Sequence, residues 1–236
     1  MEVTLATFNI ASGRIPDTDK INQLLIEQQI DIIGLQEVDC YTSRNAKNLA
    51  KEIGKETYPF QLFGEAMPFE TGKYGNAILS KYPVENYREH KFSIYGEEPR
   101  IAQVAQIYLV NNRVITICNT HLSFESIDLR QEQSAEILQT MKKFGGKYQV
   151  IVGDFNMDQS EEEWALYKKE YQLANGKNGT WLNTFHEQNV EMKKYSIDNI
   201  LVSSTIDLVE VTLIETELSD HHLLKVKIRI NEGESV

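Results

Sequence analysis

Polar side chains that can bind ions or move protons follow apolar runs at widely separated places in the chain. The segments TFNI, IIGLQE, ITICNTH and VIVGDFN each carry such residues at their ends, and SIDN and LSDHH place more beside late apolar runs. Charged groups are rarely buried without partners, so strand ends that converge would form one polar pocket. Its members would be Asn9, Glu37, Asn119, His121, Asp154, Asn156, Asp198, Asp220 and His221.

The residue types in this set indicate a particular kind of metal site. Carboxylate and amide oxygens are the ligands that Mg²⁺ and Mn²⁺ prefer. A zinc site would use more histidine or cysteine at regular spacing, and the sequence contains neither HExxH nor CxxC. A hard divalent cation among carboxylates and histidine at neutral pH indicates hydrolysis of a phosphoester.

Each residue taken alone also fits an ordinary structural role. Asn9 can cap a turn, Glu37 can be a surface carboxylate, and the Gly, Asp and Asn of GDFN are common turn formers. Arg100, in the segment EEPR, is an exposed arginine at a strand start as readily as a phosphate ligand. Only the joint pattern favours a catalytic pocket.

The elements that must position these residues begin as alternating strands and helices. Apolar patterns predict strands over 2–10 and 30–39, helices over 17–29 and 43–54, and a run of strands between 58 and 120. A helix over 126–146, a strand over 148–156, a short helix from 160 and three late strands follow. About ten strands and four helices in this order favour two packed sheets with helices outside.

Two finer predictions concern the later helices. The long helix is expected to bury an apolar face, made of Ile127, Ala135, Leu138 and Met141. Ser160 and Glu163 are expected to form a capping box at the start of the next helix.

Composition and charge limit the class of protein. The chain has 236 residues, 41% of them hydrophobic, and no visible linker, which favours one domain over 1–236. The formal net charge of −11 argues against tight non-specific DNA binding, although a bound cation can still attract a phosphate-bearing substrate. No signal peptide or transmembrane segment is visible, so we expect a soluble cytoplasmic protein.

Eight motifs in order give the chain a family resemblance: TFNI, LQEVD, YGNAILSKYP, EEPR, NTHL, VGDFN, SIDNILVS and LSDHHLL. The sequence resembles the endonuclease/exonuclease/phosphatase superfamily, which has the deoxyribonuclease-I-like fold, over nearly its whole length. The resemblance implies a four-layered α/β-sandwich, in which two mixed β-sheets pack face to face with helices on the outside. It also implies a Mg²⁺-dependent phosphoesterase site at one edge.

The resemblance further implies roles for the metal-binding and catalytic residues. Glu37 would be the principal ligand of Mg²⁺ or Mn²⁺, with Asn9 and Asp220 beside the metal. Asp154 would activate the attacking water, and Asn156 would hold the phosphate. His221 would be the catalytic histidine, oriented by Asp198, and His222 would point away.

A third group would contact the scissile phosphate: Arg100, His121, Asn119 and Asn156. Many relatives have an acidic residue before YGNAI, where this chain has Lys73. If that acid normally pairs with the histidine of NTHL, His121 lacks its usual partner here. We therefore expect His121 to be neutral and to contact phosphate rather than to act as a second acid or base.

The expected function is hydrolysis of a small or lipid-derived phosphoester, by a phosphodiesterase or a phosphatase. The alternative is a nuclease, which needs a basic groove that no Lys/Arg cluster in the sequence provides. A catalytically inactive module that binds a phospho-ligand is disfavoured, because the chain keeps Glu37, Asp154 and His221.

Overall fold

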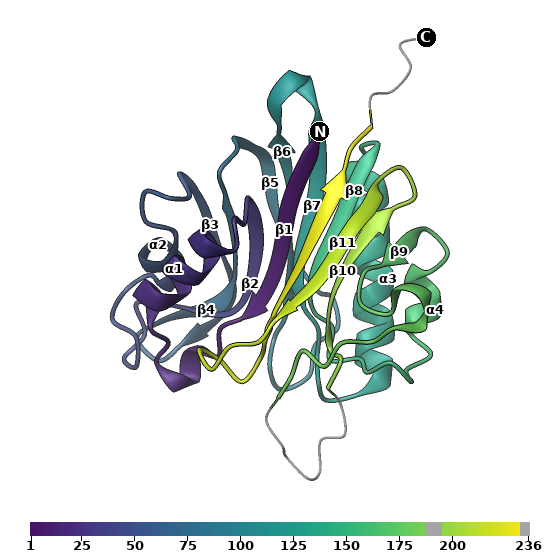
Figure 1. Cartoon of the computed structure of the whole chain (residues 1–236). Helices are drawn as coiled ribbons and strands as arrows, with labels where there is room; N and C mark the ends of the chain where they lie inside the picture. The colour runs from purple at the N-terminus through teal and green to yellow at the C-terminus, as the bar shows by residue number, and fades with distance from the viewer. Residues whose placement is uncertain (187–194, 232–236) are drawn as a thin grey trace.

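Two six-stranded sheets form the framework of the computed structural model, which describes residues 1–186 and 195–231 (Figure 1). The first sheet contains, in spatial order, β11 (Asp207–Ile214), β12 (Leu223–Arg229), β1 (Glu2–Asn9), β2 (Ile32–Cys40), β4 (Gly72–Ser80) and β3 (Phe60–Phe69). The second contains β5 (Val84–Lys91), β6 (Ile101–Tyr108), β7 (Val114–His121), β8 (Tyr148–Asp154), β10 (Asp198–Ser203) and β9 (Tyr171–Leu173). Both sheets are mixed, since β1–β2 and β7–β8 are parallel and the other neighbours are antiparallel.

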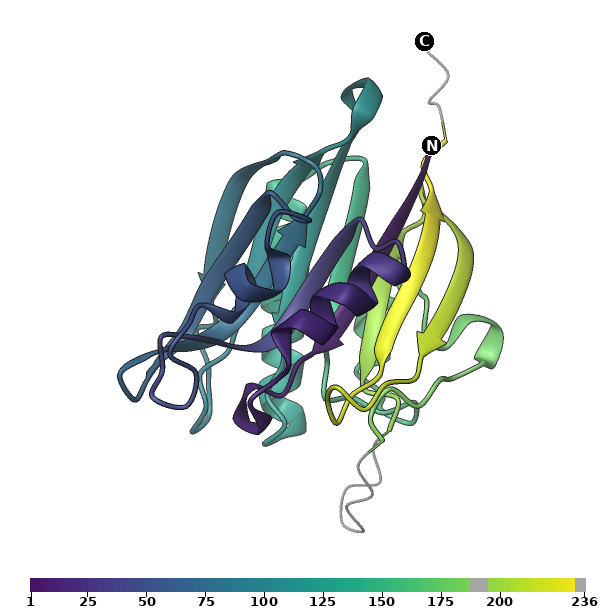
Figure 2. The ribbon, with the colours of Figure 1, turned by 60° about the vertical axis from the view of Figure 1, so that its left-hand side comes forward.

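Helices cover the outer faces of both sheets (Figures 1 and 2). The helices α1 (Thr18–Glu27) and α2 (Leu49–Gly54) lie on the first sheet, and α3 (Ile127–Phe144) and α4 (Trp164–Tyr167) lie on the second. Short 3₁₀ turns, η1 (Ser12–Arg14), η2 (Val110–Asn112) and η3 (Lys177–Gly179), complete the described elements. None of the helices in the described ranges is long and apolar enough to cross a membrane.

Three apolar layers follow from the alternation of side chains along the strands. On β1, Leu5 packs between the sheets with Ile117 and Val150, whereas Phe8 packs outward against Leu25 of α1. A third layer joins α3 and α4 to the second sheet through Cys118, Ile137, Met141, Ile151, Trp164 and Tyr167. The structure therefore confirms the four-layered α/β-sandwich.

The predicted apolar face of α3 is partly confirmed, since Met141 is buried and Leu138 packs against the third layer, but Ile127 and Ala135 are exposed. The predicted capping box is wrong. The buried face of α3 is largely polar and consists of Arg130, Gln133, Ser134, Ile137 and Met141, while Ile127 is 49% exposed. Arg130 pairs with the buried Glu163 at 2.9 Å, and Gln133 accepts a hydrogen bond from the backbone of Ser123 at 2.9 Å. Because Glu163 pairs with Arg130, it forms no capping box, and α4 begins at Trp164 without a side-chain cap.

A buried amide crosses the layer between the sheets. Asn119 of β7 donates from Nδ2 to the carbonyls of Leu35 and Ala77 on the first sheet, at 3.0 and 2.9 Å. Its Oδ1 accepts from Nε2 of Gln36 at 2.7 Å. Gly34 leaves room for this side chain, since a Cβ there would lie 2.5 Å from Asn119 Oδ1 and 2.5 Å from Val152 Cγ2.

Gly34→Ala should therefore destabilise the protein. The hydrogen-bonded Asn119 and the fully buried Val152 cannot move freely, and overpacking of this kind costs roughly 1–3 kcal/mol. Urea unfolding monitored by circular dichroism would measure the loss. Gly13→Ala is the control, because its Cβ would come no closer than 3.4 Å to Arg44. Equal stability of the two variants would contradict this account of the inter-sheet packing.

Candidate active site

The candidate residues meet at one end of the sandwich, where β1 ends away from the N-terminus (Figure 1). His121 ends β7, Asp154 ends β8 and Asp198 begins β10. The strand register pairs both His121 and Asp198 with Asp154, because β7 and β10 flank β8. Asn9 at the end of β1 and the loop 219–222 before β12 approach from the first sheet.

Glu37 reaches this end because β2 is irregular there. The pairing of β2 with β4 shifts between Leu35 and Val38, and Glu37 adopts a left-handed conformation with φ of 54°. A bulge re-aims a side chain, and a positive φ outside glycine costs on the order of 1 kcal/mol. Burial raises the pKa of Glu37, although Asn9, His221 and Arg100 oppose that shift.

The side chain of Asn9 joins the two sheets. Its Nδ2 donates to Glu37 Oε1 and to Asp154 Oδ2, each at 3.1 Å, and its Oδ1 accepts from the backbone of Ala11 at 3.0 Å. Ser219 donates to the backbone carbonyl of Asn9 at 2.7 Å, which fixes the loop that carries Asp220. One amide thus holds carboxylates from different sheets at neighbouring positions.

His221 forms a buried pair with Asp198. Its Nδ1 lies 2.8 Å from Asp198 Oδ2, and its Nε2 lies 3.7 Å from Asp154 Oδ2. Burial lowers the pKa of His221, but Asp198, Asp154 and Asp220 outweigh burial and raise this pKa to about 10. Desolvation and the charge of Asp198 raise the pKa of Asp154 to about 7. An imidazolium beside two carboxylates can donate a proton.

His121 has the opposite electrostatics. Arg100 donates from Nη1 to His121 Nδ1 at 3.1 Å, so the ring proton lies on Nε2, 3.5 Å from Asp154 Oδ2. Burial, with the positive charges of Arg100 and His221, holds the pKa of His121 well below its usual value. His121 is therefore neutral at pH 7. Lys73, which stands where many relatives carry an acidic residue, forms an ion pair with Glu65 at 2.6 Å.

Of the remaining candidates, Asn156 joins the group and Asn119 does not. Asn156, with φ of 51°, donates its backbone N–H to Asp154 Oδ1 at 3.0 Å and its amide to the carbonyl of Leu122 at 2.9 Å. Asn119 lies deeper between the sheets, where the hydrogen bonds described above use its amide. Asp220 is half-buried, and its Oδ2 lies 3.5 Å from Arg14.

His222 turns away from the group, as the sequence predicts. Its ring stacks on His186 with centroids 4.4 Å apart and an interplanar angle of 11°. Its Nδ1 accepts from the backbone of Thr216 at 3.1 Å.

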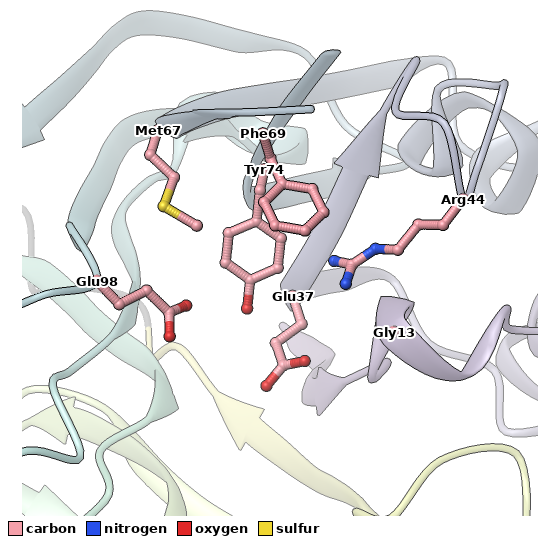
Figure 3. A pocket seen from close by; sticks show the side chains of 7 residues that line it. All are labelled: Gly13, Glu37, Arg44, Met67, Phe69, Tyr74 and Glu98. Carbon is pink, nitrogen blue, oxygen red and sulfur yellow. The ribbon is translucent and has the colours of Figure 1, made fainter. Parts of the chain in front are cut away.

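A pocket beside Glu37 contains residues that the sequence does not single out. It has a volume of about 290 Å³ and is lined by Gly13, Glu37, Arg44, Met67, Phe69, Tyr74 and Glu98 (Figure 3). Glu98 stands in EEPR, two residues before Arg100, and its Oε1 accepts from Arg100 at 2.8 Å. Its place two residues before the predicted phosphate ligand Arg100 is the signal that the sequence carries.

Two sets of atoms can hold a cation. Glu37 and Asp220 offer carboxylate oxygens, and Glu37 lies at the edge of the pocket. Asn9 lies beside them, with its Nδ2 toward Glu37 and its Oδ1 toward the backbone N–H of Ala11. Ligand atoms of Asp154, Asp198 and His221 also lie within 4.8 Å of one another. In that second set, His221 is held by Asp198 and its pKa is raised to about 10, and a protonated imidazole offers no lone pair to a cation. The carboxylate oxygens of the first set therefore fit a hard cation better.

Comparison with known proteins decides the family. The model of the endonuclease/exonuclease/phosphatase family matches residues 6–221. The chain belongs to this family. It is 29% identical over 96 residues to YbhP of Escherichia coli K12, an alignment that covers 40% of this chain and 38% of that protein.

Solved structures agree on the fold. An endonuclease/exonuclease/phosphatase from Bacteroides vulgatus superposes with a TM-score of 0.81 at 19% identity, over 98% of this chain and 100% of that one. The mannosyl-6-phosphatase Bt3783 of Bacteroides thetaiotaomicron superposes with a TM-score of 0.74 at 20% identity, over 97% of this chain and 100% of that one. These likenesses support the four-layered fold, and members of the family act on phosphoesters.

The His221–Asp198 pair predicts a titration that NMR can follow. Asp198→Asn removes the nearer of the carboxylates that stabilise the imidazolium, so the pKa of His221 should fall.

His221→Ala should reduce turnover on the order of a hundredfold or more, the usual scale for a positioned acid or base. His222→Ala, its matched neighbour, should be nearly silent. An unchanged His221 titration in Asp198→Asn, or an inactive His222→Ala, would contradict this arrangement.

Proposed function

We propose that the chain, as one domain over residues 1–236, is a divalent-metal-dependent phosphoesterase that hydrolyses a small or lipid-derived phosphoester. The observation that carries this proposal is the double hydrogen bond from Asn9 to Glu37 and Asp154. These bonds hold Glu37, a carboxylate suited to a cation, next to Asp154. The carboxylate of Asp154 lies within 4 Å of the imidazole rings of His121 and His221.

The oxygen-rich donor set fits Mg²⁺ or Mn²⁺. Glu37 would be the principal ligand, with Asn9 and Asp220 beside it and water completing the coordination, because Mg²⁺ dehydrates reluctantly. The cation would neutralise phosphate charge.

The chain's own side chains would divide the remaining work. Asp154 orients the attacking water and accepts its proton. His221 is protonated and held by Asp198, so its Nε2 can donate to the phosphate or to the leaving oxygen. A second set binds the phosphate, and its members are Arg100, neutral His121 and Asn156.

A nuclease is the second candidate, because the family description covers endonucleases and exonucleases as well as phosphatases. The net charge of −11 disfavours a nucleic-acid partner. The structural neighbours include both a phosphatase and a protein solved with a single-stranded DNA product, so they do not choose between the two candidates. A screen with Mg²⁺ or Mn²⁺ over nitrophenyl phosphate, bis-nitrophenyl phosphate, sphingomyelin, inositol phosphates and DNA separates these candidates.

Glu37→Gln tests the metal ligand directly. The amide keeps the shape of the side chain but removes its negative charge, so calorimetry should show weaker Mg²⁺ binding and turnover should largely disappear. The variant should remain folded by circular dichroism. Glu65→Gln is the control, since that carboxylate pairs with Lys73 instead of Asn9. Unchanged Mg²⁺ affinity in Glu37→Gln would place the metal elsewhere.

A further inference from the structure

The pocket beside Glu37 has walls of two chemical kinds. Figure 3 shows the rings of Phe69 and Tyr74 at the back, with Met67 and Glu98 on one side and Arg44 and Gly13 on the other. Its volume of about 290 Å³ lies at the lower end for small-molecule sites, which suits one ring-sized group rather than a polymer.

The charges that line this pocket are already paired. Arg44 donates from Nε and Nη2 to the buried carboxylate of Asp39, at 2.6 and 2.9 Å. Glu98 accepts from Arg100 at 2.8 Å, and Glu37 belongs to the proposed cation site. Within the described residues, the pocket therefore offers no unpaired cation to a second phosphate group.

The polar atoms suit a partner that both donates and accepts. Arg44 uses Nε and Nη2 for Asp39, so its Nη1 is left to donate to a ligand. Glu98 uses Oε1 for Arg100, so its second carboxylate oxygen is left to accept. A hydroxyl group satisfies either kind of atom.

The aromatic wall suits a puckered ring better than a flat one. The rings of Phe69 and Tyr74 are tilted by 47° with centroids 6.1 Å apart, so they form no parallel slot for a planar base. The guanidinium of Arg44 covers one face of Phe69, at 4.3 Å from the centroid. The remaining ring surfaces and Met67 can pack against the C–H face of a saturated ring.

We propose that this pocket binds the neutral, polyhydroxylated ring of a monophosphate ester, a sugar or cyclitol that carries a single phosphate. The inference rests on the phosphoesterase function proposed above and names its substrate class. Glu37 belongs both to the pocket and to the group around Asn9, so a ring held here brings its phosphate to the candidate active site. Water adds to phosphorus, the bond between phosphorus and the ester oxygen breaks, and that oxygen gains a proton and leaves as an alcohol of the ring, with inorganic phosphate as the second product.

Steady-state kinetics of the full chain with Mg²⁺ or Mn²⁺ test this proposal. The substrates are hexose and cyclitol monophosphates, the corresponding bisphosphates, nucleoside 5′-monophosphates and nitrophenyl phosphate. The best ring monophosphate should exceed its bisphosphate in kcat/KM by about tenfold or more, since the second phosphate meets paired charges and carboxylates.

Phe69→Ala should raise KM for that monophosphate about fivefold to tenfold with little change in kcat, because the lost contact is made before and during the reaction. Phe60→Ala is the matched control, at the opposite end of the same strand. If Phe69→Ala does not fold, the same measurement is made on Phe69→Leu, which keeps most of the apolar volume of the side chain.

The outcomes separate the two proposals. Hydrolysis of none of these monoesters overturns the substrate class. Failure of the wider screen described above, which adds diesters, sphingomyelin and DNA, contradicts the phosphoesterase function itself. Turnover of nitrophenyl phosphate combined with preference for bisphosphates or nucleotides overturns the substrate class alone. Equal KM values for Phe69→Ala and Phe60→Ala also overturn it.

Discussion

The hydrogen bonds that the Asn9 amide donates to Glu37 and Asp154 are the interaction on which the site depends. Each carboxylate stands at the end of a different sheet, and two negative groups at close range repel one another. The two N–H groups of one amide offset part of that repulsion and fix the spacing. His221, from the first sheet's side, and Arg100, from the second sheet's side, add positive charge, which makes a concentration of buried carboxylates tolerable.

Deeper between the sheets than Asn9, Asn119 fixes the irregularity in β2 that directs the side chain of Glu37 toward the site. The pairing of β2 with β4 shifts register between Leu35 and Val38, on either side of Glu37. At the start of this shift, Asn119 donates to the carbonyl of Leu35 and accepts from Gln36, the residue next to Glu37. A half-satisfied polar group here would be costly, so this side chain ties the position of Glu37 to the packing of the sheets.

The sequence predicts the four layers and most of the site for a physical reason. A carboxylate or histidine at the end of an apolar strand is costly to bury alone, so the joint pattern of Glu37, Asp154 and His221 favours a shared polar end of the molecule. The same logic misplaces Asn119, because local sequence cannot tell an amide that faces substrate from one that satisfies carbonyls in the neighbouring sheet.

Local sequence patterns also could not predict features that depend on residues far apart in the sequence. The buried face of α3 is decided by Glu163, thirty-three residues from Arg130, rather than by apolar spacing. The pocket is assembled from the β3–β4 hairpin, Arg44 and Glu98, whose side chains come together only when the sheets pack.

Anomalous diffraction from crystals soaked in Mn²⁺ tests the central claim most directly, because it locates the cation without relying on turnover. We expect a peak at ligand distance from the Glu37 carboxylate, about 2.2 Å, with Asn9 and Asp220 beside it. A peak confined to Asp154, Asp198 and His221, with none at Glu37, would contradict the assignment of the metal and the division of roles built on it.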